Sequence, residues 1–334
     1  MTEPTEGVTE PALRVAARTD VGLVRAANED ACEVFEAADG SRLLVVADGM
    51  GGHRGGATAS GTAVETIGRV FSERGSGSPG ELLSRAITTA NARIFELARS
   101  EPELSGMGTT VVALLLDARG RGTVAHVGDS RAYRYRRGRL EPLTIDHSYV
   151  ADLHRRGVIS AEEAAHHPRR NEILRSVGVG PEVEVDVAGV EVAPGDRFVL
   201  CSDGLSGVVD DDEIAAIVQA ESPAQAVDSL VELANERGGP DNITVQILAI
   251  PVDATQVDPE ATAPVEISEV GIQAIETRRR TRARLRRAGL LAALALGLIG
   301  VFVVWRILAG GQDAGRGPDA PVDEPRRGIP REAP

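Results

Sequence analysis

Aromatic residues are scarce in this chain, and lysine is absent. Only 3% of the 334 residues are aromatic, and all 36 basic side chains are arginine. So few aromatic rings argue against the stacking platforms that bind single-stranded nucleic acid and against aromatic ligand cages. Because hydrophobic residues still make up 42% of the chain, the core must be built mainly from Val, Leu, Ile and Ala.

Cysteine is nearly absent too, since the chain has only Cys32 and Cys201. Both lie in apolar, strand-like runs, and the first residues, MTEPTEGVTEP, have neither the basic start nor the apolar stretch of a secretory signal. We therefore expect the bulk of the protein to stay in a reducing cytoplasm.

The net charge of −14 is unevenly distributed along the chain. Residues 278–334 hold 12 arginines and five acids, a net charge of +7, which leaves −21 for residues 1–277. Such an acidic body is repelled by nucleic-acid phosphates and attracts cations. We therefore expect no nucleic-acid partner for the body of the protein.

Residues 12–250 alternate strand-like and helical patterns and follow a polar leader, residues 1–11, that we expect to be disordered. Short β-branched runs bounded by Gly, Asp or Pro predict strands at 43–47, 109–116, 122–128, 197–201 and 243–250. Helical spacing predicts helices at 57–73, 80–99, 211–220 and 223–237. The pattern indicates one mixed α/β or α+β domain in which helices cover a β core.

The C-terminal part has a different composition. Residues 251–277 gather Pro, Thr and acids, which is typical of a linker, and residues 278–287 hold seven arginines. The uncharged residues 288–305 would span about 27 Å as a helix, close to the hydrocarbon core of a bilayer at about 30 Å. We therefore expect a transmembrane helix over 288–308, with its arginine-rich side in the cytoplasm and residues 309–334 as a disordered extracytoplasmic tail.

Four aspartates lie at the ends or starts of apolar runs, namely Asp48, Asp129, Asp203 and Asp241. Taken singly, each fits a turn, because aspartate side chains hydrogen-bond to nearby backbone. Taken together, they could converge on one rim of a sheet, where clustered carboxylates repel unless cations or protons neutralise them. With no Cys or His at ligand spacing, oxygen ligands favour Mg²⁺ or Mn²⁺ over zinc. Gly49 has no side chain to keep its carbonyl from an ion.

Seven motifs follow one another in this part of the chain, and they are TDVGLVRAANEDA (19–31), VVADGMGGHRGGATAS (45–60), GMGTTVVALLL (106–116), VGDSRAYRYRRGRL (127–140), DHSYVADLHRRGVISAEEAAHHPRRNEILRSVG (146–178), LCSDGLSGVV (200–209) and GGPDNITV (238–245). In these motifs the chain resembles the metal-dependent protein phosphatases of the PP2C (PPM) type, in their bacterial branch. The resemblance implies an α+β fold, a four-layer αββα sandwich of two antiparallel sheets. With its predicted transmembrane helix, the whole chain resembles the membrane-anchored phosphatases that oppose bacterial receptor-type Ser/Thr kinases.

The resemblance also implies a set of metal ligands. Asp48 matches the carboxylate that bridges two cations, and Gly49 matches the residue whose carbonyl binds the second cation. Asp203 and Asp241 complete the ligands of the first cation. Asp129, with Asp203, matches the ligands of a third, weaker cation in bacterial members. The cofactors implied are two Mn²⁺ or Mg²⁺ ions, with a third as an option.

Other residues are assigned by the same resemblance. Arg25 matches the arginine that binds the substrate phosphate, a role that suits its guanidinium fork. Glu29 and Asp30 lie where the family uses acids to hold metal-bound waters, although a cap or turn remains an alternative for Asp30. His53 stands three residues after the position at which eukaryotic members have a histidine, so its role as a leaving-group acid stays open.

Residues 146–172 match the flap beside the active site, whose arginines either contact the substrate or form a solvated surface. These arginines are Arg155, Arg156, Arg169 and Arg170. The acidic run Asp210–Glu213 lacks the alternating acids, central glycine and closing glutamate of a calcium loop, so we interpret it as a helix N-terminus.

The implied reaction is hydrolysis of phosphoserine or phosphothreonine in proteins by a metal-bridging water, without a phosphoenzyme. Neither cysteine lies in the C-x₅-R setting of thiol phosphatases. Two alternatives remain: a phosphatase of the same superfamily in a sigma-factor pathway, and a catalytically silent adaptor that binds phosphoproteins at the membrane.

Overall fold

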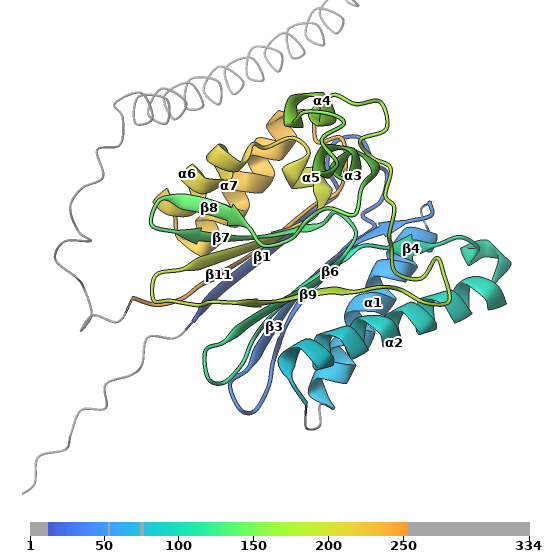
Figure 1. The fold of residues 1–334 in the computed structure, drawn as a ribbon, viewed down its shortest axis with the longest axis horizontal. Helices are drawn as coiled ribbons and strands as arrows, with labels where there is room; N and C mark the ends of the chain where they lie inside the picture. Colours follow the sequence, from blue (N-terminus) through green and yellow to red (C-terminus); the bar gives the residue numbers. More distant parts are fainter. Residues whose placement is uncertain (1–12, 53, 74–76, 253–334) are drawn as a thin grey trace, which may run out of the picture. The chain divides into compact units, whose positions relative to one another are not determined.

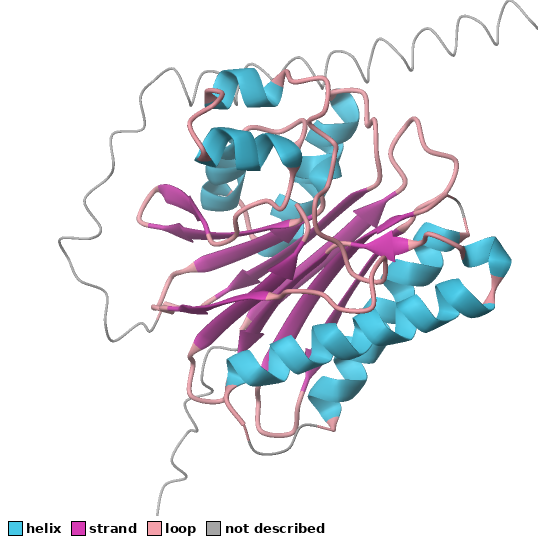
Figure 2. Cartoon of the chain, turned by 45° about the vertical axis from the view of Figure 1, so that its right-hand side comes forward, coloured by secondary structure: helices cyan, strands magenta, loops and turns pink. Residues whose placement is uncertain are grey.

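Two antiparallel sheets pack face to face, and helices cover the outer face of each (Figure 1 and Figure 2). The computed structural model describes residues 13–52, 54–73 and 77–252, and the elements named below belong to these ranges. The prediction of an α+β fold with two antiparallel sheets between helical layers is confirmed.

Each sheet combines strands that lie far apart in the sequence. The first sheet has the order β1-β11-β10-β7-β8, with β1 (Arg14–Asp20), β7 (Arg131–Arg136), β8 (Arg139–Pro142), β10 (Arg197–Cys201) and β11 (Ile243–Ala249). The second has the order β2-β3-β5-β6-β9, with β2 (Asp30–Glu36), β3 (Arg42–Met50), β5 (Val111–Leu116), β6 (Gly122–Val127) and β9 (Asp186–Val190). A short strand, β4 (Gly108–Thr109), pairs with the end of β3.

The helices fall into three groups. The second sheet is covered by α1 (Gly55–Ser72) and α2 (Pro79–Ser100), after which comes a 3₁₀ turn, η1 (Pro102–Leu104). The first sheet is covered by α6 (Asp211–Ala220) and α7 (Pro223–Glu236), which follow the short α5 (Asp203–Ser206). The flap holds α3 (Tyr149–Arg155) and α4 (Ala161–Ala165). Asp210 caps α6 in a capping box with Glu213, so the acidic run is a helix N-terminus, as predicted.

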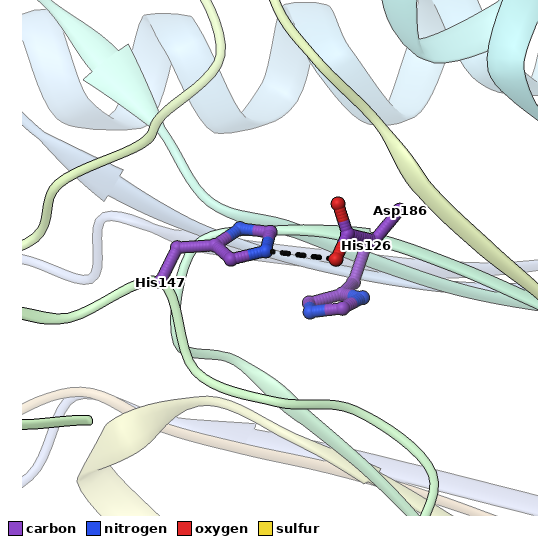
Figure 3. A group of neighbouring side chains, drawn as sticks. All are labelled: His126, His147 and Asp186. Carbon is purple, nitrogen blue, oxygen red and sulfur yellow. Dashed lines mark ion pairs between the residues drawn. The ribbon is translucent and has the colours of Figure 1, made fainter. Parts of the chain in front are cut away.

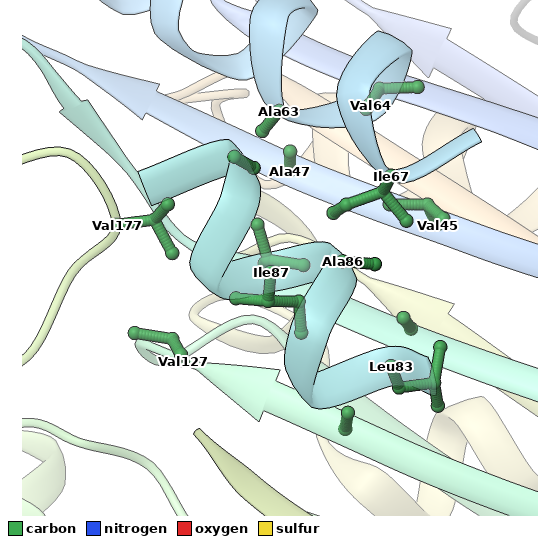
Figure 4. Packing of buried hydrophobic residues seen from close by; sticks show 14 of the residues in the cluster. Val45, Ala47, Ala63, Val64, Ile67, Leu83, Ala86, Ile87, Val127 and Val177 are labelled. Carbon is green, nitrogen blue, oxygen red and sulfur yellow. The ribbon is translucent and has the colours of Figure 1, made fainter. Parts of the chain in front are cut away.

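The core explains why the central strands are apolar on both faces. In β3, Val45 and Ala47 pack under α1 and α2 (Figure 4). Leu43 belongs to the same cluster, whereas Leu44 and Val46 pack between the two sheets. Because both faces are buried, the run is continuously hydrophobic and does not alternate with polar residues. At Asp48, next in line on the inter-sheet side, this apolar pattern ends.

The predicted strands and helices are found with ends shifted by a few residues, but several elements were not predicted. They are β1, β2, β7, β8, β9, α3, α4 and α5. These segments are short or rich in charged residues, as RVAARTD of β1 and RAYRYR of β7 show. The predicted strand 109–116 is also interrupted at Thr110, whose backbone N–H turns to the carbonyl oxygen of Asp48.

The membrane prediction falls on residues that the structure does not describe. Residues 253–334 contain the predicted arginine-rich segment, transmembrane helix and tail and most of the linker, and residues 1–12 contain the leader. Among the helices of the described ranges, none is long and apolar enough to cross a membrane.

Candidate metal centre

The four strand-end aspartates predicted from the sequence meet at one end of the sandwich. Both β3 and β6 run antiparallel to β5, so Asp48 lies level with Gly128, the residue before Asp129. In the other sheet, β10 leads into Asp203 while the antiparallel β11 starts just after Asp241. The topology therefore brings two carboxylates from each sheet to the same rim.

Asp30 joins the two sheets at this rim. It is the first residue of β2 and lies opposite Asp48 in the strand pairing, so it is not a helix cap. Its Oδ2 accepts hydrogen bonds from Ser202 Oγ at 2.8 Å, just after β10, and from Thr244 Oγ1 at 2.7 Å, in β11 of the facing sheet. The aspartate is thereby fixed next to the other carboxylates.

Crowding raises the pKa values of these carboxyl groups. The pKa of Asp48 lies well above its ordinary value because of burial and the nearby charges of Asp30, Asp203 and Asp129. Burial also raises the pKa of Asp30 and of Asp129 to about 7, and that of Asp203 moves upward for the same reason. Without cations, the cluster therefore binds protons in place of metal.

Several carboxylate oxygens in this cluster have no partner within the described part of the chain. Asp30 Oδ1, Asp129 Oδ1 and Asp203 Oδ1 are buried and accept no hydrogen bond from described residues. Buried oxygens normally have partners, so these three are suited to receive cations or waters bound to them. An all-oxygen set of carboxylates fits the hard cations Mg²⁺ and Mn²⁺.

Arg25 lies beside the cluster and contacts one of the predicted ligands. Its Nη2 donates to Asp241 Oδ2 at 2.7 Å, while the other oxygen, Oδ1, accepts from the backbone N–H of Asn242 at 2.8 Å. Burial acts against this guanidinium charge, but Asp241 and, more weakly, Glu29 and Asp48 raise its pKa. The arginine side chain is about half exposed (52%), so it remains accessible to a ligand.

Glu29 and Gly49 pack where β2, β3 and the start of α1 meet. The N–H of Gly49 donates to the carbonyl oxygen of Glu29 at 3.2 Å, and Ser60 Oγ donates to the same oxygen at 2.6 Å. A Cβ added to Gly56 would lie 2.0 Å from Glu29 Oε2, so the carboxylate fits only because Gly56 has no side chain. Glu29 is thus buried against the first turn of α1.

The flap begins and ends next to the cluster, and three of its four arginines form local ion pairs. Arg155 and Arg156 pair with Asp152, and Arg169 pairs with Glu172 and lies over the ring of Tyr149. Arg170 instead lines a cavity of about 560 Å³ between the flap and α5. Asp129 and Asp203 line the same cavity, so Arg170 is the one of these four flap arginines that shares a cavity with aspartates of the rim. His53 lies outside the described residues.

The sequence analysis missed the neutral residues that hold the aspartates in place. Asn242 accepts from the Glu29 N–H at 2.7 Å and donates to the carbonyl oxygens of Val21 and Ala27, which ties the Arg25 loop to Asp241. Thr110 Oγ1 accepts from the Asp48 N–H at 3.0 Å and contacts Ser130 Oγ at 2.7 Å. The only sequence signal for Asn242 is its place beside Asp241 in the GGPDNITV motif.

Comparison with known proteins agrees with this arrangement. The sequence model of the family described as Protein phosphatase 2C matches residues 24–244. Serine/threonine protein phosphatase PstP of Mycobacterium tuberculosis is 41% identical over 253 residues, which is 76% of this chain but only 47% of PstP. Serine/threonine phosphatase stp of Listeria monocytogenes is 41% identical over 250 residues, which is 73% of this chain and 98% of that protein.

A solved structure extends the likeness to the fold. The catalytic domain of PstP, crystallised with two manganese ions, superimposes with a TM-score of 0.64 and 41% identity, over 72% of this chain and 99% of that domain. The family match includes every aspartate of the rim and strands of both sheets, from β2 to the start of β11. The chain therefore belongs to the protein phosphatase 2C family.

Proposed function

We propose that the chain is a metal-dependent protein serine/threonine phosphatase that hydrolyses phosphoserine and phosphothreonine in proteins. The observation that carries the proposal is the rim of aspartates from both sheets, with buried oxygens that accept no hydrogen bond from the described residues. The names of PstP and of the Listeria protein, both serine/threonine phosphatases, support the same reaction.

The acidic residues of the rim would have two roles, binding the cations and holding the waters bound to them. Asp48, Asp203 and Asp241 would hold two Mn²⁺ or Mg²⁺ ions together with the Gly49 carbonyl, and Asp129 with Asp203 would hold a third. When bound, such cations lower the pKa of water and offset the charge of the phosphoryl group. Glu29 and Asp30, the two further acids at the rim, would hold waters bound to the ions.

Arg25 orients the substrate. Its guanidinium is paired with Asp241, and a dianionic phosphate would compete with that carboxylate once a cation neutralises it. The fork of N–H groups then fixes two phosphoryl oxygens and sets the direction of attack. We leave His53 as an open candidate for the acid that protonates the leaving group.

A thiol mechanism is the main chemical competitor, and the cysteines do not suit it. Burial raises the pKa of the Cys201 thiol to about 12 and that of Cys32 to about 11. At neutral pH both groups are protonated and are poor nucleophiles. Direct attack by water at the carboxylate rim needs no such group.

Removal of Arg25 tests both the reaction and the substrate site. On a phosphothreonine peptide with Mn²⁺, Arg25→Ala should lower kcat/KM by about 30-fold, or about 2 kcal/mol, mainly through a higher KM. Arg18→Ala, which removes an arginine paired with Asp228 on α7, is the matched control and should behave as wild type. Equal kinetics for Arg25→Ala and wild type would exclude Arg25 from the site. No turnover by wild type, with Mn²⁺ still bound, would favour the silent adaptor instead.

We propose further that the phosphatase is anchored in the membrane. The proposal assigns residues 12–250 to the catalytic domain, 251–277 to a linker, 278–287 to an arginine-rich stop and 288–308 to a transmembrane helix, with 1–11 and 309–334 disordered. Its support is the uncharged run that follows seven arginines. The substrates would then be phosphoproteins at or near the cytoplasmic face, including receptor-type kinases. A sigma-factor pathway is the alternative source of substrate.

Reporter fusions test this topology. Alkaline phosphatase, which is active only outside the cytoplasm, should be active when fused after Pro334 and inactive when fused after Thr277. The arginine cluster is the physical reason, because it keeps its side of the helix in the cytoplasm. The reverse pattern, or inactivity at both positions, would disprove the proposed orientation or the membrane span.

A further inference from the structure

A second group of metal-ligand residue types lies apart from the aspartate rim, but hydrogen bonds explain it better than a metal does. His126, His147 and Asp186 offer ligand atoms within 4.8 Å of one another (Figure 3). His147 Nδ1 already accepts the N–H of Gly128 at 3.1 Å, and Nε2 lies 3.3 Å from Asp186 Oδ2 and 3.2 Å from Arg175 Nη1. Arg175 Nη1 also contacts Asp186 Oδ1 at 2.5 Å, which supplies the positive charge there.

His147 holds the peptide just before Asp129 from two sides. Its ring accepts the Gly128 N–H, and its own backbone N–H donates to the Gly128 carbonyl oxygen at 2.9 Å. Both polar groups of one residue are therefore bonded to a single histidine. Because Asp129 is the next residue, the direction in which its carboxylate leaves the chain depends on these bonds.

Gly128 has a backbone conformation that favours glycine. Its φ is +106°, and an added Cβ would lie 2.6 Å from Thr110 Cγ2. Glycine is the residue with the most conformational freedom, so local sequence does not fix this peptide. The contacts of His147 supply the missing constraint.

The same histidine lies at the base of the flap. Its carbonyl oxygen accepts the N–H of Leu174 at 2.7 Å, and Ser148 pairs with Ile173. The ring stacks on His126 with a centroid distance of 4.6 Å, and burial, His126 and Arg175 lower the pKa of His147. One residue thus connects both ends of the flap to the loop that carries Asp129.

We propose that His147 is a positioning residue that fixes Asp129 for cation binding and links the flap base to that site. The inference rests on the proposed function, because it takes Asp129 to be a ligand of the third cation. Asp186 and Arg175 orient the ring from the side of β9, and Gly128 transmits its position to Asp129.

Calorimetric titration of the metal-free full-length protein with Mn²⁺ tests the role of His147 independently of activity. His147→Ala should weaken the low-affinity Mn²⁺ site by about 10-fold, in line with other residues that orient metal ligands. His147→Asn keeps an acceptor oxygen where Nδ1 was and should remain within about 3-fold of wild type. The tight sites at Asp48 and Asp241 should be unchanged in both variants, which also shows that the variants fold.

Two further variants separate the possible failures. His147→Gln places its polar group too far out to accept the Gly128 N–H, so it should behave like the alanine variant. Asp129→Asn should abolish the weak site; if it does not, Asp129 is not a ligand, and the inference fails with that assignment while the tight sites stand. If Asp129→Asn abolishes the site but His147→Ala binds like wild type, the positioning role alone is wrong. Equal losses in the alanine and asparagine variants would indicate packing and would also overturn it.

Discussion

Replacement of Asp203 by asparagine should lower phosphatase activity by about 10³-fold, equivalent to about 4 kcal/mol of transition-state stabilisation. In the proposed assignment Asp203 helps to hold the two main cations and also, with Asp129, the third. Burial and the nearby charge of Asp241 raise the pKa of Asp203, and its Oδ1 is buried and accepts no hydrogen bond from described residues. Asparagine keeps the shape but removes the charge that a cation needs. Kinetics on a phosphothreonine peptide with Mn²⁺ measure the loss.

The same variant should lose most of the rise in melting temperature that Mn²⁺ causes in the wild type. Asp212→Asn is the matched control, because Asp212 is an exposed acid in the first turn of α6, where the cavity lining does not include it. This control should keep both activity and the Mn²⁺ effect. Full activity of Asp203→Asn would place the chemistry elsewhere in the protein.

The metal-free protein should become less stable as pH rises from about 5 to 8. The pKa of Asp30 and of Asp129 is about 7 in the folded protein against an ordinary 3.8, so the folded state binds more protons than the unfolded state across this window. Stability therefore falls with rising pH and stays low above pH 7. His147 acts in the opposite direction with its lowered pKa, but it is one group against several carboxyls.

Thermal unfolding in chelator at several pH values measures this effect. Asp30→Asn should flatten the pH dependence and raise the melting temperature of the metal-free protein at pH 8, because it removes a charge from the cluster. Saturating Mn²⁺ should reverse the trend, with its largest stabilisation above pH 7, where protons no longer neutralise the carboxylates. A metal-free melting temperature that rises steadily from pH 5 to 8 would contradict the proton count.

The sequence was sufficient to predict the parts of the fold that are continuously apolar. The strand LLVVA and its aspartate, Asp48, could be recognised because both faces of β3 are buried. Edge strands such as β1 were missed because their exposed residues, Arg14, Ala17 and Thr19, do not give a pattern that differs from that of a loop.

The aspartates of the site were predictable from the sequence, but the contacts that hold them were not. Four aspartates at strand ends indicate a cation site without any knowledge of topology. The hydrogen bonds that fix the site join residues far apart in the sequence, so local patterns do not predict them. Ser202 and Thr244 reach Asp30 across 172 and 214 residues, and neither residue type signals such a role. The hydrogen bonds between His147 and Gly128 could likewise not be predicted, since a histidine in a polar motif is equally compatible with a surface position.

Phosphate release by the full-length wild-type protein in excess chelator, and again after Mn²⁺ is restored, tests the central claim most directly. With free Mn²⁺ at 100 times the dissociation constant, the folded state should gain about 2.7 kcal/mol by mass action. A phosphothreonine peptide should be hydrolysed only when Mn²⁺ is bound. No turnover in chelator together with recovery in Mn²⁺ is the predicted result, and hydrolysis that persists in chelator would contradict the account.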